Sequence, residues 1–141
     1  MKRMLQPSEA SMASITEFPF VEQIEDEAMA LLLEARDALS DPDAPTQTST
    51  TGTGRLMAAH RNFEVTARLS WVVAWVLYQK AVRNGEMSPE DANARHPPLD
   101  MPRDPAPGED AAITADLQDR LVRCRALYDR AAGFEDRAGA F

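Results

Sequence analysis

The sequence predicts an all-α fold, a three-helix bundle with a long, highly buried central helix and a short extra helical turn after it. Three stretches carry apolar residues at three- and four-residue steps, which is the spacing of one helix face. The middle stretch contains an almost continuous apolar run over residues 69–78, and a helix that is apolar nearly all round must be buried nearly all round. No alternating pattern typical of a strand occurs.

The first helix is expected over about residues 19–40. Its periodic apolar positions are Phe18, Val21, Ile24, Ala28, Leu31, Leu32, Ala35 and Leu39. Residues 1–16 are rich in polar residues without periodicity, which predicts a disordered N-terminal segment. The two prolines and two aspartates at 41–45 end the helix, and a flexible loop is expected over about 41–54.

The central helix is expected from about Arg55 to Asn84, and Gly85 can supply the left-handed residue that ends many helices. One side carries Val65, Leu69, Val72, Val73 and Val76, and next to it lie Phe63, Ala67, Ala74, Leu77 and Ala81. The apolar run within it is about ten residues long, whereas a membrane span needs about twenty. The sequence therefore predicts a core helix and no membrane partner.

Ser88, Pro89, Glu90 and Asp91 form a strong helix start signal, and a short helical turn is expected to reach about Arg95. Five prolines between 97 and 107 then predict an extended connector, flexible over about 96–108. The last helix is expected to open near Glu109, with one apolar face that carries Ile113, Leu117, Leu121, Cys124, Leu127, Tyr128 and Ala131. The bundle is thus placed at 17–132 and a C-terminal tail at 133–141.

The 141 residues fit one domain, and the formal net charge of −8 argues against nucleic acid and anionic membranes as partners. The lone Cys124 cannot form an internal disulfide, which fits a reducing compartment. Residues 5–16 lack the apolar stretch of a signal peptide, so a cytoplasmic protein is expected.

The acids of the first helix are the strongest candidates for enzyme chemistry. Glu22, Glu25 and Asp26, followed by Glu34 and Asp37, resemble the carboxylate clusters with which all-α nucleoside triphosphate pyrophosphohydrolases hold magnesium. In that family the clusters lie on two facing helices, whereas here they spread over a broad face of one helix. The favoured interpretation is a solvated polar face, and a small Mg-dependent nucleotide hydrolase is the alternative.

Other candidate groups favour structural roles. His60 and Glu64 share a helix face and are interpreted as a surface pair, and Cys124 as a small buried hydrophobe. Residues 51–55 contain two glycines but lack the lysine of a phosphate loop. We therefore predict a protein that is not an enzyme, with no catalytic, cofactor-binding or metal-binding residues.

A third sector of the central helix carries Trp71, Trp75, Tyr78 and Val82 and becomes polar towards the start of the helix. A small bundle does not usually cover three sectors of one helix, and Trp and Tyr are enriched in interface cores. These four residues are predicted to lie at or beside a symmetric dimer contact. The alternative is that the chain's own ends or the connector cover them.

Residues 63–87 resemble the central helix of a bacterial family, the regulator of CtrA degradation, RcdA. That helix has a Thr-x-Arg-Leu start, an Ala/Ser-Trp-Leu-Leu-x-Gln-Arg-Ala-Val core and a Gly-Glu-Met end. The matching residues here are Thr66, Arg68, Leu69, Ala74, Trp75, Leu77, Gln79, Ala81, Val82, Gly85, Glu86 and Met87. Residues 127–130 also resemble the family's Leu-Tyr-Glu-Arg in the last helix.

This resemblance implies a three-helix bundle that forms a homodimer and has no catalytic activity. It further implies an adaptor in regulated proteolysis, which delivers cell-cycle regulators as protein clients to the ClpXP protease. The chain departs from the family pattern at Lys80, where the family often has Arg, and at the bulky Trp71.

Overall fold

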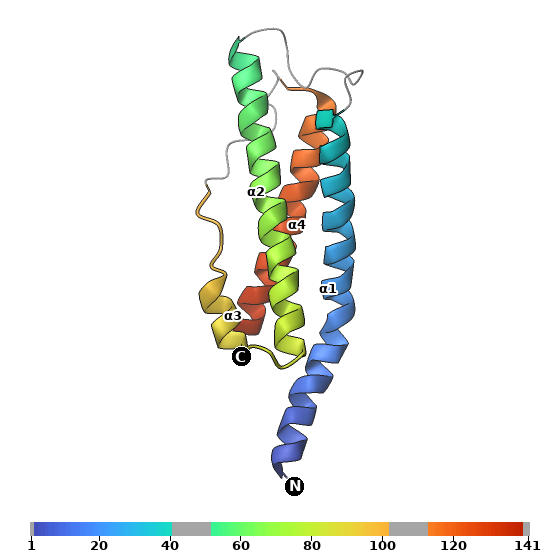
Figure 1. The fold of residues 1–141 in the computed structure, drawn as a ribbon, viewed down its shortest axis with the longest axis vertical. Helices are drawn as coiled ribbons and strands as arrows, with labels where there is room; N and C mark the ends of the chain where they lie inside the picture. The colour runs from blue at the N-terminus through green and yellow to red at the C-terminus, as the bar shows by residue number, and fades with distance from the viewer. Residues whose placement is uncertain (1, 41–51, 102–112, 140–141) are drawn as a thin grey trace.

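The structure, a computed structural model, describes residues 2–40, 52–101 and 113–139, with side chains described over 19–40, 52, 54–101 and 113–134. It contains the helices α1 (Lys2–Ser40), α2 (Gly52–Arg83), α3 (Pro89–Arg95) and α4 (Ala115–Gly139) (Figure 1). No strand occurs in these described ranges, so the predicted all-α class is confirmed there. The long helices α1, α2 and α4 pack against one another, and the short α3 packs against the end of α2.

The helix α1 runs opposite to both other long helices, as Figure 1 shows and the ion pairs between helices agree. Lys80 near the end of α2 reaches Glu25 near the middle of α1, with Nζ 2.9 Å from Oε2. Arg123 of α4 contacts Glu34, and Arg130, two turns later, contacts Glu27, two turns earlier in α1. α1 is therefore antiparallel to α2 and to α4.

The helices α2 and α4 run in the same direction. The Cys124 thiol lies 3.6 Å from the Val65 carbonyl oxygen, and further along both helices the Phe134 ring meets the Trp75 ring edge-on at 5.5 Å. A parallel pair cannot be joined by a short turn. After α3, residues 96–101 run back beside α2 (Figure 1).

The predicted core faces agree well with the burial of side chains. All seven apolar positions predicted for the last helix are buried, as are Val21, Ile24, Ala28 and Leu31 of α1. In α2 the side that carries Val65, Leu69, Val72 and Val76 is buried too. The neighbouring apolar sector of α2, which carries Phe63 and Leu77, is not buried in the same way, because these two side chains are 64% and 59% exposed.

Two predicted boundary signals are confirmed. Gly85 has φ +76°, its N–H donates to the carbonyl of Val82, and the N–H of Glu86 donates to that of Ala81. This double hydrogen bond is the Schellman ending, which requires a left-handed residue. The Ser88 hydroxyl accepts from the N–H of Asp91 at 3.1 Å and so caps α3, which ends at Arg95.

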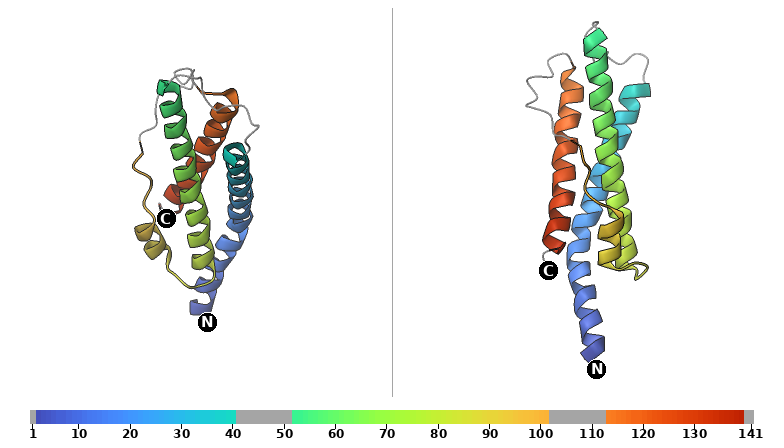
Figure 2. Two further views of the ribbon diagram at one scale, coloured as in Figure 1. Left: turned by 45° about the horizontal axis from the view of Figure 1, so that its top comes forward. Right: turned by 90° about the vertical axis from the view of Figure 1, so that its left-hand side faces the viewer.

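The ends of the chain differ from expectation. Residues 2–16, predicted to be disordered, continue α1, whose first part extends beyond the other helices (Figures 1 and 2). Adding residues to an existing helix costs far less than starting one, so α1 can extend through a segment without apolar periodicity. The predicted C-terminal tail is helical to Gly139, and Phe134 within it stacks on Phe20 with ring centroids 5.4 Å apart.

The boundaries of the two predicted loops also differ from the structure. Gly52–Gly54, assigned to a flexible loop, form the first turn of α2. The last helix begins at Ala115 instead of near Glu109, because the Thr114 hydroxyl accepts from the N–H of Leu117 at 3.2 Å and caps it. Most of the predicted flexible loops, residues 41–51 and 102–108, lie outside the described residues.

Candidate functional site

The structure places both tryptophans of the predicted interface inside the chain. Trp75 is fully buried and Trp71 is 5% exposed, whereas Tyr78 and Val82 are partly buried. Trp75 Nε1 makes no hydrogen bond within the described part of the chain, so this indole contributes through packing. Neither tryptophan offers a broad surface to a second subunit.

The start of the proline-rich connector covers Trp71. Its Nε1 donates to the carbonyl of Pro97 at 2.8 Å, and the His96 ring stacks on it with centroids 4.4 Å apart. His96 Nε2 lies 2.9 Å from the Trp71 carbonyl oxygen, and its ring is 5.2 Å from that of Tyr78. This covering by the connector is the alternative that the sequence left open. A dimer contact beside Tyr78 and Val82 stays a prediction.

Residue 99 is held to α4 as well. Its backbone N–H donates to the Tyr128 hydroxyl at 3.0 Å, and the Tyr128 ring meets the Trp71 ring edge-on at 4.8 Å. The connector was expected to be flexible from residue 96. Over 96–99, however, specific hydrogen bonds attach it to two helices.

The helix α2 has an unusual outward face, which we define as Leu56, Ala59, His60, Phe63, Thr66, Ala67, Ser70, Ala74, Leu77 and Ala81. Leu56, Phe63 and Leu77 are 73%, 64% and 59% exposed. This face has no Asp, Glu, Lys or Arg over about seven turns. Surface helices usually place their charges outward and their apolar residues inward.

The charged residues in the middle of α2 point inward instead. Between residues 56 and 79 these are Arg61, Glu64 and Arg68, and all three are buried. Arg125 of α4 joins them and donates from Nε to Glu64 Oε2 at 2.7 Å and from Nη2 to Oε1 at 2.9 Å. Together these four residues form what we call the buried ion cluster.

Two further contacts complete the buried ion cluster. Arg68 Nε donates to Glu64 Oε2 at 2.8 Å, and Arg61 Nη1 lies 3.7 Å from Oε1. The Arg68 guanidinium also lies over the Tyr128 ring, 4.9 Å from its centroid. One buried carboxylate thus holds three arginines between α2 and α4.

Opposing effects act on the Glu64 carboxyl. Burial disfavours its charged form, but hydrogen bonds from Arg125 and Arg68 favour that form more, and its pKa is lowered. Glu64 is therefore ionised at neutral pH.

The interpretation of His60 and Glu64 as a surface pair was wrong, because Glu64 turns inward to the arginines while His60 is exposed.

The acids of the first helix do not meet at one point. Glu25 pairs with Lys80, Glu34 pairs with Arg123, and Glu22 and Asp26 are exposed. No group of three or more His, Cys, Asp or Glu side chains able to hold a metal ion occurs among the described residues. This placement agrees with a polar helix face, as the sequence analysis favoured.

Cys124 is buried, as its interpretation as a small hydrophobe requires. Burial raises the pKa of its thiol to about 12, with smaller effects from Arg68, Glu64 and Arg125. Its Sγ lies within 3.6 Å of the Val65 carbonyl oxygen. The thiol is therefore protonated at neutral pH.

In the described part of the chain, none of the helices has the length and apolar character needed to cross a membrane.

Sequence reasoning missed the outward face of α2 and the buried ion cluster. One signal was present, since Arg61, Glu64 and Arg68 recur at three- and four-residue steps and share a side with Trp71 and Trp75. Charges that share a sector with two tryptophans are either on the surface or paired inside. The sequence does not show which, because the fourth member, Arg125, comes from a distant helix.

Comparison with known proteins gives a family without an assigned activity. A family model described as "Protein of unknown function (DUF1465)" matches residues 12–140. No curated protein and no solved structure matches the chain. The match covers most of the chain, including α1 from residue 12, the whole of α2, α3 and α4, and the buried ion cluster. The chain therefore belongs to the DUF1465 family.

Proposed function

We propose that this protein is a non-enzymatic protein-interaction module that forms a homodimer through the outward face of α2. The observation that carries the proposal is the absence of charge from this face, together with three large exposed apolar side chains. Exposed apolar surface of this kind typically marks a contact with another protein. We infer that α1, α2 and α4 form the three-helix bundle expected from the resemblance to RcdA.

The pattern of the outward face favours a second copy of the chain as the occupant. Leu56, Phe63, Ser70 and Leu77 recur at seven-residue steps, and His60, Ala67, Ala74 and Ala81 follow each of them by four residues. Two such stripes pack together along a helix pair. The first stripe carries the large side chains Leu56, Phe63 and Leu77, whereas the second stripe has only alanine after His60.

An antiparallel pair of α2 helices makes these stripes complementary. With the two-fold axis between Ala67 and Ser70, Phe63 faces Ala74 of the second copy, and Leu77 faces His60. Leu56 faces Ala81 of the second copy in the same register. In a two-fold contact, a charged residue near the axis lies close to the same residue of the second copy, and the two like charges repel each other. An uncharged face therefore suits a symmetric contact.

The dimer is tested by light scattering coupled to size exclusion at tens of micromolar protein. The wild type is expected to elute with the mass of a dimer, and Phe63→Glu should raise the dissociation constant at least about thirtyfold. Leu39→Glu is the matched control, because it adds the same charge at a 62% exposed position of α1. A monomeric wild type would overturn the proposal.

The register is tested by restoring the contact. The double variant Phe63→Glu with Ala74→Lys should regain the dimer, because each new glutamate would face a new lysine of the second copy. Phe63→Glu with Leu77→Lys should stay monomeric, since these two positions do not face each other in the proposed register. Rescue by the second pair alone would reject the register.

We further propose, from the resemblance to RcdA, that the dimer acts as an adaptor in regulated proteolysis. Supporting features are the motif in α2 and the absence of a clustered carboxylate site among the described residues. A pull-down from native lysate would supply candidate clients. Each is then degraded by purified ClpXP with and without this protein. Faster degradation is expected, and an unchanged rate for every client would reject the adaptor role.

A further inference from the structure

Residues 96–99, with the sequence His-Pro-Pro-Leu, form a short linear segment that lies against α2 and α4. The Pro97 carbonyl accepts from Trp71 Nε1 at 2.8 Å, and the N–H of Leu99 donates to the Tyr128 hydroxyl at 3.0 Å. The His96 ring stacks on the Trp71 ring with centroids 4.4 Å apart. Three of the four residues thus contact aromatic side chains of the two long helices.

The two prolines give this segment an extended backbone. A proline ring fixes φ at about −65°, and a residue before a proline favours extended conformations, so Pro97 favours the polyproline II form. This form has three residues per turn, which places His96 and Leu99 on the same side. Both are partly buried, whereas Pro97 and Pro98 are exposed. The segment therefore contacts the bundle through two side chains three residues apart, and the prolines set its shape.

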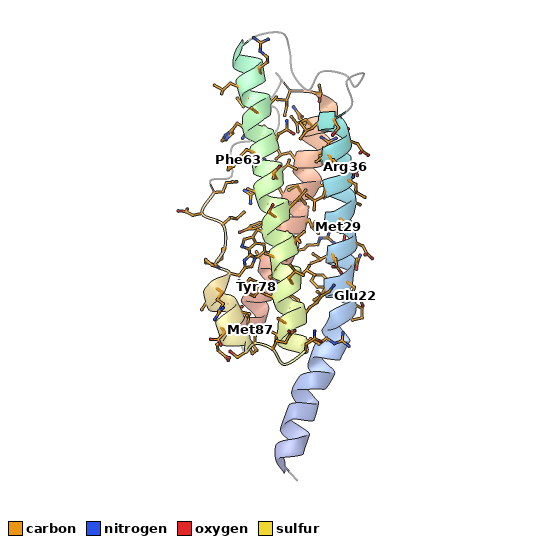
Figure 3. All side chains as sticks on the ribbon, viewed as in Figure 1. Glu22, Met29, Arg36, Phe63, Tyr78 and Met87 are labelled. Carbon is orange, nitrogen blue, oxygen red and sulfur yellow. The ribbon has the colours of Figure 1, made fainter. Side chains whose placement is uncertain are left out.

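The surface under the segment consists of aromatic side chains of α2 and α4. The Tyr128 ring meets the Trp71 ring edge-on at 4.8 Å, and both residues belong to the apolar core. Tyr78 lies on the side of α2 next to α3, with its ring 5.2 Å from that of His96 (Figure 3). Because packing between α2 and α4 holds Trp71 and Tyr128, this aromatic surface does not need residues 96–99 in order to form.

The segment and the short helix before it are attached through few buried side chains. In α3 the buried residue is Ala92, and the other residues of this helix are exposed. A region with few buried apolar contacts opens at a low free-energy cost compared with the core. The helix α3 and residues 96–99 can therefore leave the bundle while α1, α2 and α4 stay packed.

We propose that this aromatic surface binds a proline-rich segment of a partner protein, and that residues 96–99 occupy the site in the free chain. Proline-rich segments typically dock on aromatic surfaces, because their extended backbone is formed before binding. The partner segment carries two adjacent prolines, with an aromatic ring or imidazole before them and a large apolar residue after them. It must displace residues 96–99, which the chain keeps at a high effective concentration.

This site goes beyond the proposed dimer, because Trp71 and Tyr128 are buried side chains that do not belong to the outward face of α2. The occupant is also different, since the outward face takes a second α2 helix and the aromatic surface takes an extended segment. The two contacts can therefore form at the same time or separately.

The test measures fluorescence anisotropy of a fluorescein-labelled peptide, Arg-His-Pro-Pro-Leu-Asp, which has the sequence of residues 95–100. The full chain is opened by His96→Ala with Leu99→Pro, which removes the ring on Trp71 and the N–H that reaches Tyr128. This opened variant should bind the peptide at least about tenfold more tightly than the wild type, because its internal competitor is weakened. A peptide with Gly-Gly in place of Pro-Pro should bind at least about tenfold more weakly, since its backbone is not preformed.

A second pair of variants tests the indole N–H. In the opened variant, Trp71→Phe keeps an aromatic ring but removes the donor to the proline carbonyl, so it should weaken peptide binding about fivefold. Trp75→Phe is the matched control, because it makes the same change one turn later in α2. The Trp75 indole makes no hydrogen bond within the described part of the chain, and its loss should leave peptide binding unchanged.

Four results would overturn this proposal. These are no binding of the proline peptide to the opened variant, equal affinity of the wild type and the opened variant, equal binding of the two peptides, or equal effects of Trp71→Phe and Trp75→Phe. Circular dichroism checks that each variant is folded, and Leu99→Pro alone gives the same comparison if the double variant unfolds. Phe63→Glu added to the opened variant should bind the peptide as a monomer, so failure of this site and failure of the dimer are distinguished.

Discussion

Arg125 holds the Glu64 carboxylate with two hydrogen bonds, of 2.7 and 2.9 Å, across the interface between α4 and α2. Both residues are buried, with 8% and 2% of their surface exposed. Two parallel N–H···O contacts fix the orientation of the two groups as well as their distance. The pair therefore specifies the register of two parallel helices that no short turn connects.

Removal of the buried Glu64 carboxylate should destabilise the protein strongly. Glu64→Gln removes the charge that Arg61, Arg68 and Arg125 share, and the loss of one partner from a buried pair costs about 3–5 kcal/mol. We expect this decrease in the free energy of unfolding, measured by urea denaturation. Glu22→Gln removes the same charge from an exposed site of α1 and should change stability little. Equal midpoints for the two variants would contradict the role of the cluster.

Stability should fall at mildly acidic pH because of His96. Burial lowers the pKa of its imidazole, and the hydrogen bond with the Trp71 carbonyl opposes this only in part. The unfolded chain, with a pKa of about 6.5, then binds the proton more readily than the folded chain. The contribution of neutral His96 is thus present above that pKa and is lost as the pH falls towards the lower, folded value.

The measurement compares urea denaturation of the wild type and His96→Gln over a range of pH. The glutamine cannot titrate but keeps an N–H donor for the Trp71 carbonyl. The two stability curves should run parallel above about pH 7.5 and approach each other as the wild type loses stability below about pH 6.5. Curves that stay parallel through this window would show that His96 does not titrate differently in the folded state.

Two glycines should respond to alanine with opposite signs. Gly85 has φ +76°, and an L-residue in that conformation costs about 1–2 kcal/mol. Gly133 lies inside α4, where alanine is favoured over glycine by about 0.5–1 kcal/mol. An added Cβ would meet no atom within 4 Å at either site, so backbone conformation alone decides. Gly85→Ala should lower the melting temperature and Gly133→Ala should raise it. A shift of the same sign in both would reject this account.

Trp75→Ala should cost about 3–5 kcal/mol in the free energy of unfolding, because it removes a fully buried ring from the core. Leu39→Ala, at a 62% exposed position, serves as the control and should cost far less. If Trp75 instead lay at the dimer contact, its loss would weaken association more than folding. Denaturation and light scattering on the same variant decide between the two.

The helices and their core faces could largely be predicted from the sequence. Periodic apolar residues locate α1, α2 and α4, and Gly85 and Ser88 mark two boundaries with local signals that need no tertiary information. The start of α4 was misplaced because the acids near residue 109 and the capping Thr114 are both good start signals. Local sequence patterns of this kind do not show at which of two possible positions a helix begins.

The outward face of α2 could not be predicted, because hydrophobicity alone does not show which side of α2 faces the other helices. Its Trp-bearing sector contains Arg61, Glu64 and Arg68, so it looked partly polar, whereas the sector of Phe63 and Leu77 looked wholly apolar. Burial of the first sector depends on Arg125 and on the contacts of residues 96–99 with Trp71 and Tyr128. These partners are distant in sequence, so no local pattern indicates them.

The order of the helices along the chain also bears on how the protein assembles on the ribosome. The α1–α2 hairpin emerges first, while Arg125 and Phe134 are still to be synthesised. Until α4 follows, the nascent hairpin exposes Trp75 and the side of α2 on which Glu64 lies, and hydrophobic surface of that kind attracts chaperones. The apolar core and the buried ion cluster can therefore close only once α4 has been made.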